Sequence, residues 1–229
     1  MEKYDFSFSI VILAENNNPT ILNPDFLVRA KIVPPDWTLS QPPLTTPAFS
    51  RINYSTGVLF TVDPERFTVK DFAPSGELFP VPKIAMQYLK KVPHVKYHSL
   101  GINFEKALVF PKPKNAREFQ KLRFLKNGPW EMDGDLSDFA TKFIYSFSDS
   151  QCNITFSSPV ILKLPQYEGK PKDGLIISAN FHRDFKKIKD HEERNKNIIE
   201  HIVRWEKDKT IFESITDKLI GEEQWLKKM

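Results

Sequence analysis

The sequence has a single cysteine, Cys152, among its 229 residues. One thiol excludes an intramolecular disulfide framework and any metal site that needs two or more cysteines. The histidines offer no substitute, because His94 and His98 lie four residues apart in a strand-like segment, which separates them by about 13 Å. We therefore expect no metal centre and no cofactor, and we expect Cys152 to be a buried, unreactive thiol.

Glycine is also scarce, with 8 Gly against 18 Pro. The sequence contains neither the Gly-x-x-x-x-Gly-Lys-Ser/Thr phosphate loop nor the Gly-x-Gly-x-x-Gly dinucleotide fingerprint. It also lacks the Gly-x-Ser-x-Gly turn that carries the nucleophile of α/β-hydrolases. These absences exclude the recognisable forms of three large enzyme classes.

Long apolar runs are missing as well. The longest early run covers residues 10–14, and no segment approaches the ~20 residues that a membrane-spanning helix needs. The N-terminus lacks the basic region, apolar run and small-residue cleavage site of a secretory signal. We expect a cytoplasmic protein with no membrane partner.

The charge is close to balance, because 33 basic residues face 29 acidic ones and leave a net charge of +4. Aromatic residues reach 13%, with 19 Phe, enough large side chains to fill a sizeable core. A small basic excess makes nucleic acid a possible partner without favouring it. The candidate nucleic-acid contacts are Lys121, Arg123 and Lys126 on a Lys-rich helix.

Period-two alternation over residues 4–13 predicts a first strand with Phe6, Phe8 and Ile10 on one face. Short runs separated by compact turns predict an antiparallel meander. Its strands are expected at 48–54, 58–62 and 66–69. Further strands are expected over 94–104 with a bulge at Gly101, over 136–147 and 153–164 as a hairpin, and over 174–181.

Period-3.6 stripes predict the helices. One begins at Pro80 to Pro82 and ends before Pro93, and another runs from a cap at Asn115 to about Leu125, with Phe119 and Leu122 facing inward. Two amphipathic stripes follow in the charged C-terminal segment. They consist of Ile198, Ile199, Ile202 and Val203, then Phe212, Ile215 and Leu219.

These elements predict an α+β fold with a large, mainly antiparallel sheet, helices covering one face and a helical C-terminus. We expect one domain over residues 1–229, with 1–128 and 129–229 as candidate sub-lobes. Both halves run from strands to helices, and Asn103-Phe104 in the first matches Asn180-Phe181 in the second. This pattern is consistent with two strand-rich lobes that share one sheet.

The catalytic candidates are His182, Arg183 and Asp184, which lie at the end of a strand just before a helix. A His, an Arg and an Asp there could transfer protons or bind phosphate. The triplet resembles a kinase catalytic loop, but Lys189 stands where that loop carries an asparagine. The competing interpretation, in which Asp184 caps the next helix and the other two are solvated, is favoured because such residues commonly begin helices.

Three tryptophans are candidate protein-binding residues. Trp37 lies in a proline-dense segment, residues 34–47, where it is either a lid over the core or an exposed anchor. Trp205 and Trp225 lie in the charged C-terminal segment. Because Trp is highly buried on average, the lid is the favoured interpretation of Trp37.

The C-terminal segment resembles a known pattern. His201 with Trp205, residues 212–219 and Trp225 resemble the C-terminal signature of a sporadically distributed family of uncharacterised bacterial proteins. Residues 101–104, Gly-Ile-Asn-Phe, resemble the central strand of that family. The resemblance implies an α+β fold and no particular activity. Patchy families often belong to mobile or antiviral defence modules, which is an association and not a mechanism.

The absence of a catalytic constellation favours a non-enzymatic accessory protein. We expect it to bind another protein or to form a homo-oligomer, in the setting of a bacterial defence or toxin–antitoxin module. The alternatives are a nucleic-acid-binding protein that uses its Lys-rich helices, and a hydrolase or nuclease with its site near His182.

Overall fold

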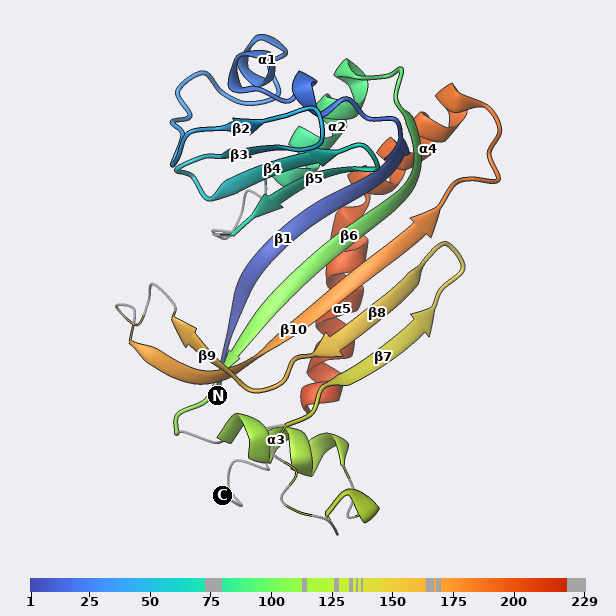
Figure 1. Cartoon of the computed structure of the whole chain (residues 1–229). Helices are drawn as coiled ribbons and strands as arrows, with labels where there is room; N and C mark the ends of the chain where they lie inside the picture. Colours follow the sequence, from blue (N-terminus) through green and yellow to red (C-terminus); the bar gives the residue numbers. More distant parts are fainter. Residues whose placement is uncertain are drawn as a thin grey trace.

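The computed structural model describes residues 1–72, 80–112, 115–125, 128–131, 134, 136, 138–163, 167 and 170–221. Within these residues the chain forms one ten-stranded antiparallel sheet with five α-helices, so the predicted α+β class is confirmed (Figure 1). No helix in this part of the chain is both long and apolar enough to cross a membrane.

The elements are as follows. The strands are β1 (Glu2–Glu15), β2 (Leu44–Thr45), β3 (Ser50–Asn53), β4 (Val58–Asp63), β5 (Arg66–Asp71), β6 (Lys96–Val109), β7 (Thr141–Ser146), β8 (Gln151–Phe156), β9 (Val160–Lys163) and β10 (Pro171–Asp184). The helices are α1 (Pro24–Arg29), α2 (Val81–Lys91), α3 (Asn115–Phe124), α4 (His191–Val203) and α5 (Trp205–Ile220), with short 3-10 turns η1 (Pro19–Ile21) and η2 (Pro129–Glu131).

The strand order is β2-β3-β4-β5-β1-β6-β10-β8-β7, and β9 pairs with β10 beside this path. The three longest strands, β1, β6 and β10, have 14 residues each and lie side by side at the centre. Because β6 comes from the first half of the chain and β10 from the second, strands from both candidate sub-lobes belong to one sheet.

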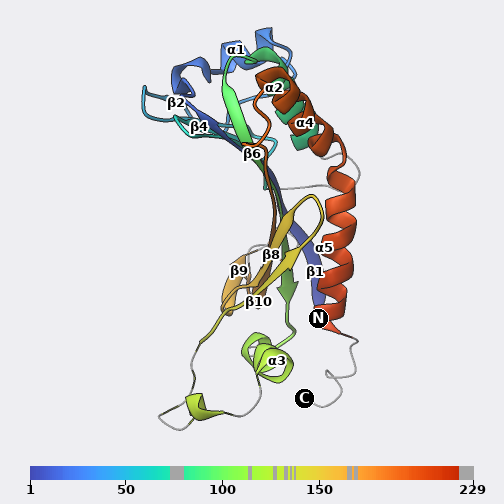
Figure 2. The same cartoon turned by 90° about the vertical axis from the view of Figure 1, so that its right-hand side faces the viewer.

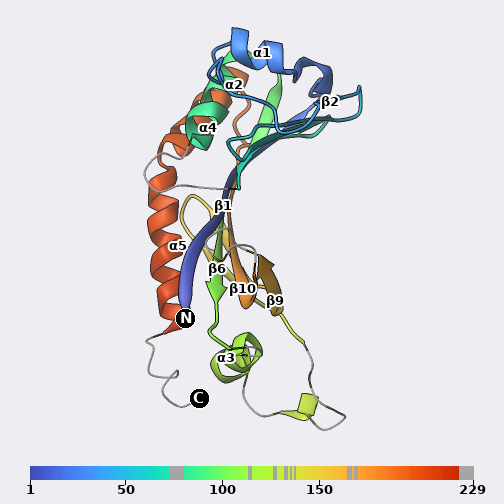
Figure 3. The ribbon, with the colours of Figure 1, turned by 90° about the vertical axis from the view of Figure 1, so that its left-hand side faces the viewer.

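Three of the described helices, α2, α4 and α5, lie along one side of the sheet. Figures 2 and 3 view the sheet nearly edge-on, with α2, α4 and α5 along one side, and its two ends bend toward the other side. We call the side that packs against these helices the covered face and the opposite side the open face. Strand alternation assigns neighbouring residues of each strand to different faces.

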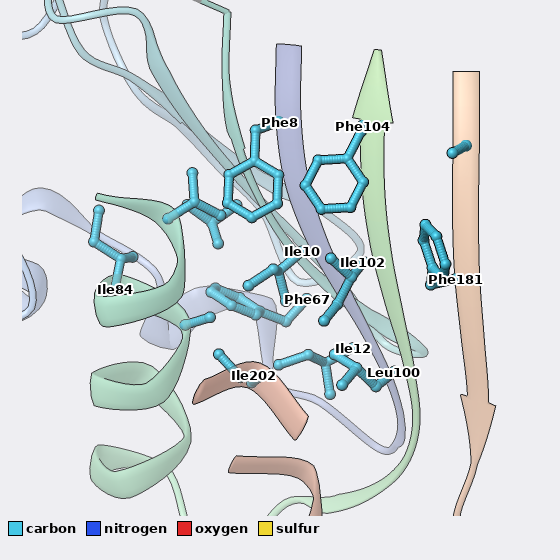
Figure 4. Close-up of a cluster of buried hydrophobic side chains, with 14 of the residues drawn as sticks. Phe8, Ile10, Ile12, Phe67, Ile84, Leu100, Ile102, Phe104, Phe181 and Ile202 are labelled. Atoms are coloured by element: carbon cyan, nitrogen blue, oxygen red, sulfur yellow. The ribbon is translucent and has the colours of Figure 1, made fainter. Parts of the chain in front are cut away.

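The core fills the covered face (Figure 4). At its centre Phe104 of β6 stacks on Phe8 of β1, with ring centroids 5.0 Å apart, and on Phe212 of α5 at 5.7 Å. Ile84 of α2 and Ile202 of α4 are both buried in the same cluster. Apolar stripes at helical spacing therefore dock onto apolar rows at strand spacing, as the sequence predicts.

The meander and the two C-terminal helices form as expected, but several details differ. Residues 153–164 do not form one strand, because β8 ends at Phe156 and β9 begins at Val160. Gly101 carries no bulge, since the pairing of β6 with β10 is continuous from residue 99 to residue 109. Leu122 is 68% exposed, whereas Phe119 is buried. The buried residues of α3 are Asn115, Ala116, Phe119 and Gln120, so the inward stripe does not include Leu122.

The first strand corrects one further expectation. The pairing of β1 with β6 shifts register between Asp5 and Ser7. Phe6 is the extra residue of this bulge, and it packs with Tyr4 in a second, smaller apolar cluster around Ala107 and Leu162. Phe8 and Ile10 lie in the main core, so Phe6 does not share their face.

Candidate protein-binding face

The open face carries rows of small polar side chains across five strands. One row of paired residues consists of Ser9, Asn103, Asn180, Asn153 and Ile144, from β1, β6, β10, β8 and β7. The next row consists of Ser7, Glu105, Ser178, Thr155 and Lys142 from the same strands. No described helix covers these rows (Figure 3). The amides of Asn103, Asn153 and Asn180 are partly exposed, whereas Ser7 and Ser9 are buried.

Hydrogen bonds orient the central amides. Asn180 Nδ2 donates to Asn103 Oδ1, and Asn103 Nδ2 donates to Ser9 Oγ at 3.3 Å. Residue 101, two positions before Asn103, is glycine, and a Cβ there would lie 3.0 Å from Asn180 Nδ2. The close approach of this amide to the backbone therefore favours glycine at residue 101.

A shallow hollow of about 290 Å³ lies over these rows. Its lining includes the amides of Asn103, Asn153 and Asn180 and the hydroxyls of Ser9, Thr155 and Ser178. Charge is limited to its rim. Glu105 forms an ion pair with Lys70 at 2.9 Å, whereas Lys142 is exposed and forms no ion pair with any described residue. The hollow thus offers mostly neutral donors and acceptors, with one uncompensated positive charge.

A second hollow of about 530 Å³ lies at the other end of the same face. It is lined by Glu15, Glu65, His98 and Lys186 among others. His98 Nδ1 lies 2.9 Å from Ser99 Oγ. Burial, and then the neighbouring Lys186 ammonium, hold the pKa of His98 below its usual value despite the carboxylates of Asp184 and Glu15. This end of the open face therefore carries both acidic and basic side chains.

The three catalytic candidates do not converge. Strand alternation places His182 and Asp184 on the open face, whereas Arg183 points to the covered face and is 5% exposed. Asp184 Oδ1 accepts a hydrogen bond from the Lys186 amide, and Asp190, not Asp184, caps helix α4. The competing interpretation is therefore wrong about the cap and about a solvated Arg183.

Arg183 instead forms a buried, two-pronged ion pair with Asp208 of α5. Both hydrogen bonds, Nη1 to Oδ2 and Nη2 to Oδ1, measure 2.8 Å, and Asp208 is 2% exposed. Asp149 approaches the same guanidinium at 3.8 Å, and His201 of α4 lies 4.0 Å from Asp149. This cluster attaches the C-terminal helices to β10 beneath the sheet.

Burial and the Arg183 guanidinium shift the pKa values of His201, Asp149 and Cys152 in and beside this cluster. Burial, and then the Arg183 charge, hold the pKa of His201 below its usual value. For Asp149 burial acts to raise the pKa, but Arg183, a hydrogen bond from Ser150 and nearby cations together hold it below the usual value. Burial raises the pKa of the Cys152 thiol to about 12, and the Asp208 charge adds to this effect. These shifts favour a neutral thiol and imidazole in the core.

Of the candidate nucleic-acid contacts, Arg123 has an intramolecular role. Its Nε and Nη2 donate to the carbonyl oxygens of Leu219 and Lys218 at 2.5 and 2.8 Å, which caps the C-terminal end of α5. Lys121 lies on α3 and is half-buried. Lys126 lies outside the described residues.

The tryptophans differ in their surroundings. Trp37 is half-buried, with its ring 5.2 Å from that of Tyr54, and it lines an apolar hollow of about 540 Å³ that includes Lys31 and Lys83. Trp205 packs on Phe8 of the core at 5.0 Å, so its ring serves to dock α5 on the sheet. Trp225 lies outside the described residues.

The described residues hold no group of three or more His, Cys, Asp or Glu side chains placed to bind one metal ion. No family model and no curated protein matches the sequence. The resemblance to a sporadically distributed bacterial family therefore stays a prediction.

Sequence reasoning did not identify the open face as a site. The residues that line it, Asn103, Asn153 and Asn180 among them, occur singly in strands that are otherwise apolar or mixed. Two signals pointed toward them: period-two alternation, and the Asn-Phe pair repeated in the two halves. Neither signal indicates which strands become neighbours.

Proposed function

We propose that this chain is a non-enzymatic, protein-binding component that holds its partner against the open face. The observation that supports this proposal is a polar row across four adjacent strands that no described helix covers. It consists of the partly exposed amides of Asn103, Asn180 and Asn153, next to the buried Ser9. Three of the strands, β1, β6 and β10, are the long central strands of the sheet, so the row rests on the most extensively paired part of the fold.

The chemistry of the row suits recognition better than catalysis. Amide and hydroxyl groups both donate and accept hydrogen bonds, as a polypeptide backbone and its polar side chains require. They supply neither a general base nor an activated nucleophile by themselves. The partner we propose presents an extended, polar segment with an acidic group that can reach Lys142 on the rim.

The cellular setting is part of the proposal and rests on the family resemblance alone. In a bacterial defence or toxin–antitoxin module, an accessory chain of this kind would bring its partner into an assembly without acting on a substrate. The nucleic-acid and hydrolase alternatives have less support. Arg123 is engaged with the end of α5, and Arg183 is buried away from His182.

Affinity purification of the tagged chain from its native host tests the proposal, with a nuclease-treated sample in parallel. We expect a stoichiometric protein partner that survives nuclease. Thr155→Arg would place a long cation in the hollow and should abolish recovery of that partner. Thr210→Arg is the matched control, because Thr210 is exposed on α5 on the helix side of the molecule.

The alternatives predict different results in the same experiment. Nucleic acid that is recovered with the chain and removed by nuclease would favour the nucleic-acid alternative, provided that its yield falls as the salt concentration rises. Equal partner recovery with Thr155→Arg and with Thr210→Arg would contradict binding at the open face. A hydrolase with its site near His182 requires an activity that His182→Ala removes, and unchanged activity would eliminate that alternative.

A further inference from the structure

The two ends of the sheet differ in how their outer edges are protected. At one end β2 has two residues, and Pro42, Pro43 and Pro47 flank it closely. At the other end β7 has six residues, Thr141–Ser146, and contains no proline. Short edges and prolines prevent a further strand from pairing, so β2 is protected and β7 is not. Figure 2 looks toward the β7–β8 hairpin, in front of which no other described helix or strand lies.

Hydrogen bonding in the β7–β8 hairpin determines which backbone groups of β7 point outward. The Phe147 amide donates to the Ser150 carbonyl at 2.8 Å, which makes these two residues a hydrogen-bonded pair. Hydrogen-bonded and non-hydrogen-bonded pairs alternate along an antiparallel ladder. The N–H and C=O groups of Lys142, Ile144 and Ser146 therefore point away from β8, and no described residue pairs with them.

The same three residues present their side chains on the open face. Ile144 lies in the row of Asn153 and Asn180, and Lys142 lies in the row of Thr155. Ile144 is 58% exposed, an apolar side chain at the middle of an edge strand in an otherwise polar row. An exposed apolar residue at an unpaired edge indicates an interaction surface.

We propose that the occupant of this edge is a second copy of the chain, paired antiparallel through β7 about a two-fold axis at Ile144. In this register Ile144 faces Ile144 of the second copy, and Lys142 faces Ser146 of the second copy. All three outward-pointing residues then form hydrogen-bonded pairs, each of which exchanges two backbone bonds. Lys142, the charged residue of β7, lies opposite the Ser146 hydroxyl of the second copy, so like charges do not meet.

Self-complementarity is the reason for choosing a second copy over the strand of another protein. A two-fold axis normal to the sheet keeps each open face on the same side, which requires facing residues to come from the same face of the two strands. Centring on Ile144 satisfies this requirement and pairs apolar with apolar. The result is one continuous sheet in which the polar rows of the two copies adjoin through Ile144.

The edge is narrow, and we expect the dimer to be weak and dependent on concentration. Sedimentation equilibrium should give a mass that rises with concentration from 26.6 kDa toward twice that value. Ile144→Lys would oppose two ammonium groups at the axis and should keep the chain monomeric at every concentration. Ile161→Lys is the matched control and should associate like the wild type, because Ile161 is 66% exposed on β9.

Disulfide trapping provides the second measurement. In hydrogen-bonded pairs the Cα atoms lie about 5.5 Å apart, within the range that a disulfide spans. Under mild oxidation Ile144→Cys should form a covalent dimer and Ile161→Cys should not, while the native Cys152 is fully buried and contributes no crosslink. This test does not depend on the proposed partner of the open face.

Two results would overturn the proposal. A wild-type mass that stays at the monomer value, with no more crosslinking of Ile144→Cys than of Ile161→Cys, would exclude pairing of two copies through β7. Association that Ile144→Lys leaves unchanged would place the dimer interface elsewhere. Circular dichroism of each variant distinguishes either result from loss of the fold.

Discussion

Asn103 of β6 lies directly opposite Asn180 of β10, and the two side-chain amides are hydrogen-bonded on the open face. The residue after each asparagine is a phenylalanine, and the rings of Phe104 and Phe181 meet edge-to-face on the covered face, 6.1 Å apart. The Asn-Phe pairs of the two halves of the sequence thus meet at the centre of the sheet. One side chain of each pair contributes to the core and the other to the candidate binding face.

The hydrogen bond between the two amides should be measurable as a coupling. Asn180→Ala leaves Asn103 Oδ1 without its donor and should lower the free energy of unfolding by about 1 kcal/mol. Asn103→Ala should cost a similar amount, and the double variant should cost less than the two together, by about 0.5 kcal/mol or more. Urea denaturation measures all three, and strictly additive losses would mean that the bond contributes nothing.

The buried pair of Arg183 and Asp208 should be the most sensitive polar contact. Asp208→Ala leaves a guanidinium uncompensated in the core and should destabilise the fold by about 3–5 kcal/mol. Replacing both residues, as Arg183→Met with Asp208→Leu, removes the unpaired buried charge and should restore most of the lost stability.

The control for this prediction is an exposed ion pair. Lys3 and Asp217 form an ion pair at 2.7 Å with both side chains more than a third exposed. Asp217→Asn should therefore cost less than about 1 kcal/mol in the same denaturation experiment. Equal losses for Asp208→Ala and Asp217→Asn would show that burial does not determine the strength of these contacts.

Stability should fall on mild acidification, partly because of His201. Its pKa in the folded chain lies below the ordinary value of 6.5, since burial and Arg183 outweigh the carboxylates of Asp149 and Asp208, and Arg204 adds further positive charge. Below about pH 6.5 the unfolded chain then binds a proton that the folded chain does not, so acid favours unfolding.

His201→Gln should reduce this pH dependence. The free energy of unfolding, measured by denaturation at a series of pH values, should decline less steeply below about pH 6.5 in the variant than in the wild type. His94→Gln serves as the control, because His94 lies exposed in the turn before β6. Identical slopes for the wild type and His201→Gln would contradict the lowered pKa.

The Cys152 thiol should not react in the folded protein. It is fully buried, and burial raises its pKa to about 12, so the reactive thiolate is scarce at neutral pH. Ellman's reagent should label one thiol per chain in denaturant and almost none under native conditions. Rapid labelling of the native protein would mean that β8 opens or that the thiol is accessible.

The sequence by itself determined the local elements. Period-two alternation predicted the strand that contains Phe8 and Ile10, and period-3.6 spacing predicted helix α2, which buries Ile84 and Tyr88. Compact turns predicted the antiparallel meander of β3, β4 and β5. These features depend on residues that are neighbours in the chain, and backbone geometry converts their spacing directly into a face.

Only the tertiary structure decided which faces meet. Arg183 resembled a solvated or catalytic residue until α5, 25 residues away, placed Asp208 beside it. The bulge at Phe6 reverses the face expected from simple alternation. The pairing of Asn103 with Asn180 joins positions 77 residues apart. Such contacts depend on the packing of distant segments, and the open face exists because the C-terminal helices cover the opposite side of the sheet.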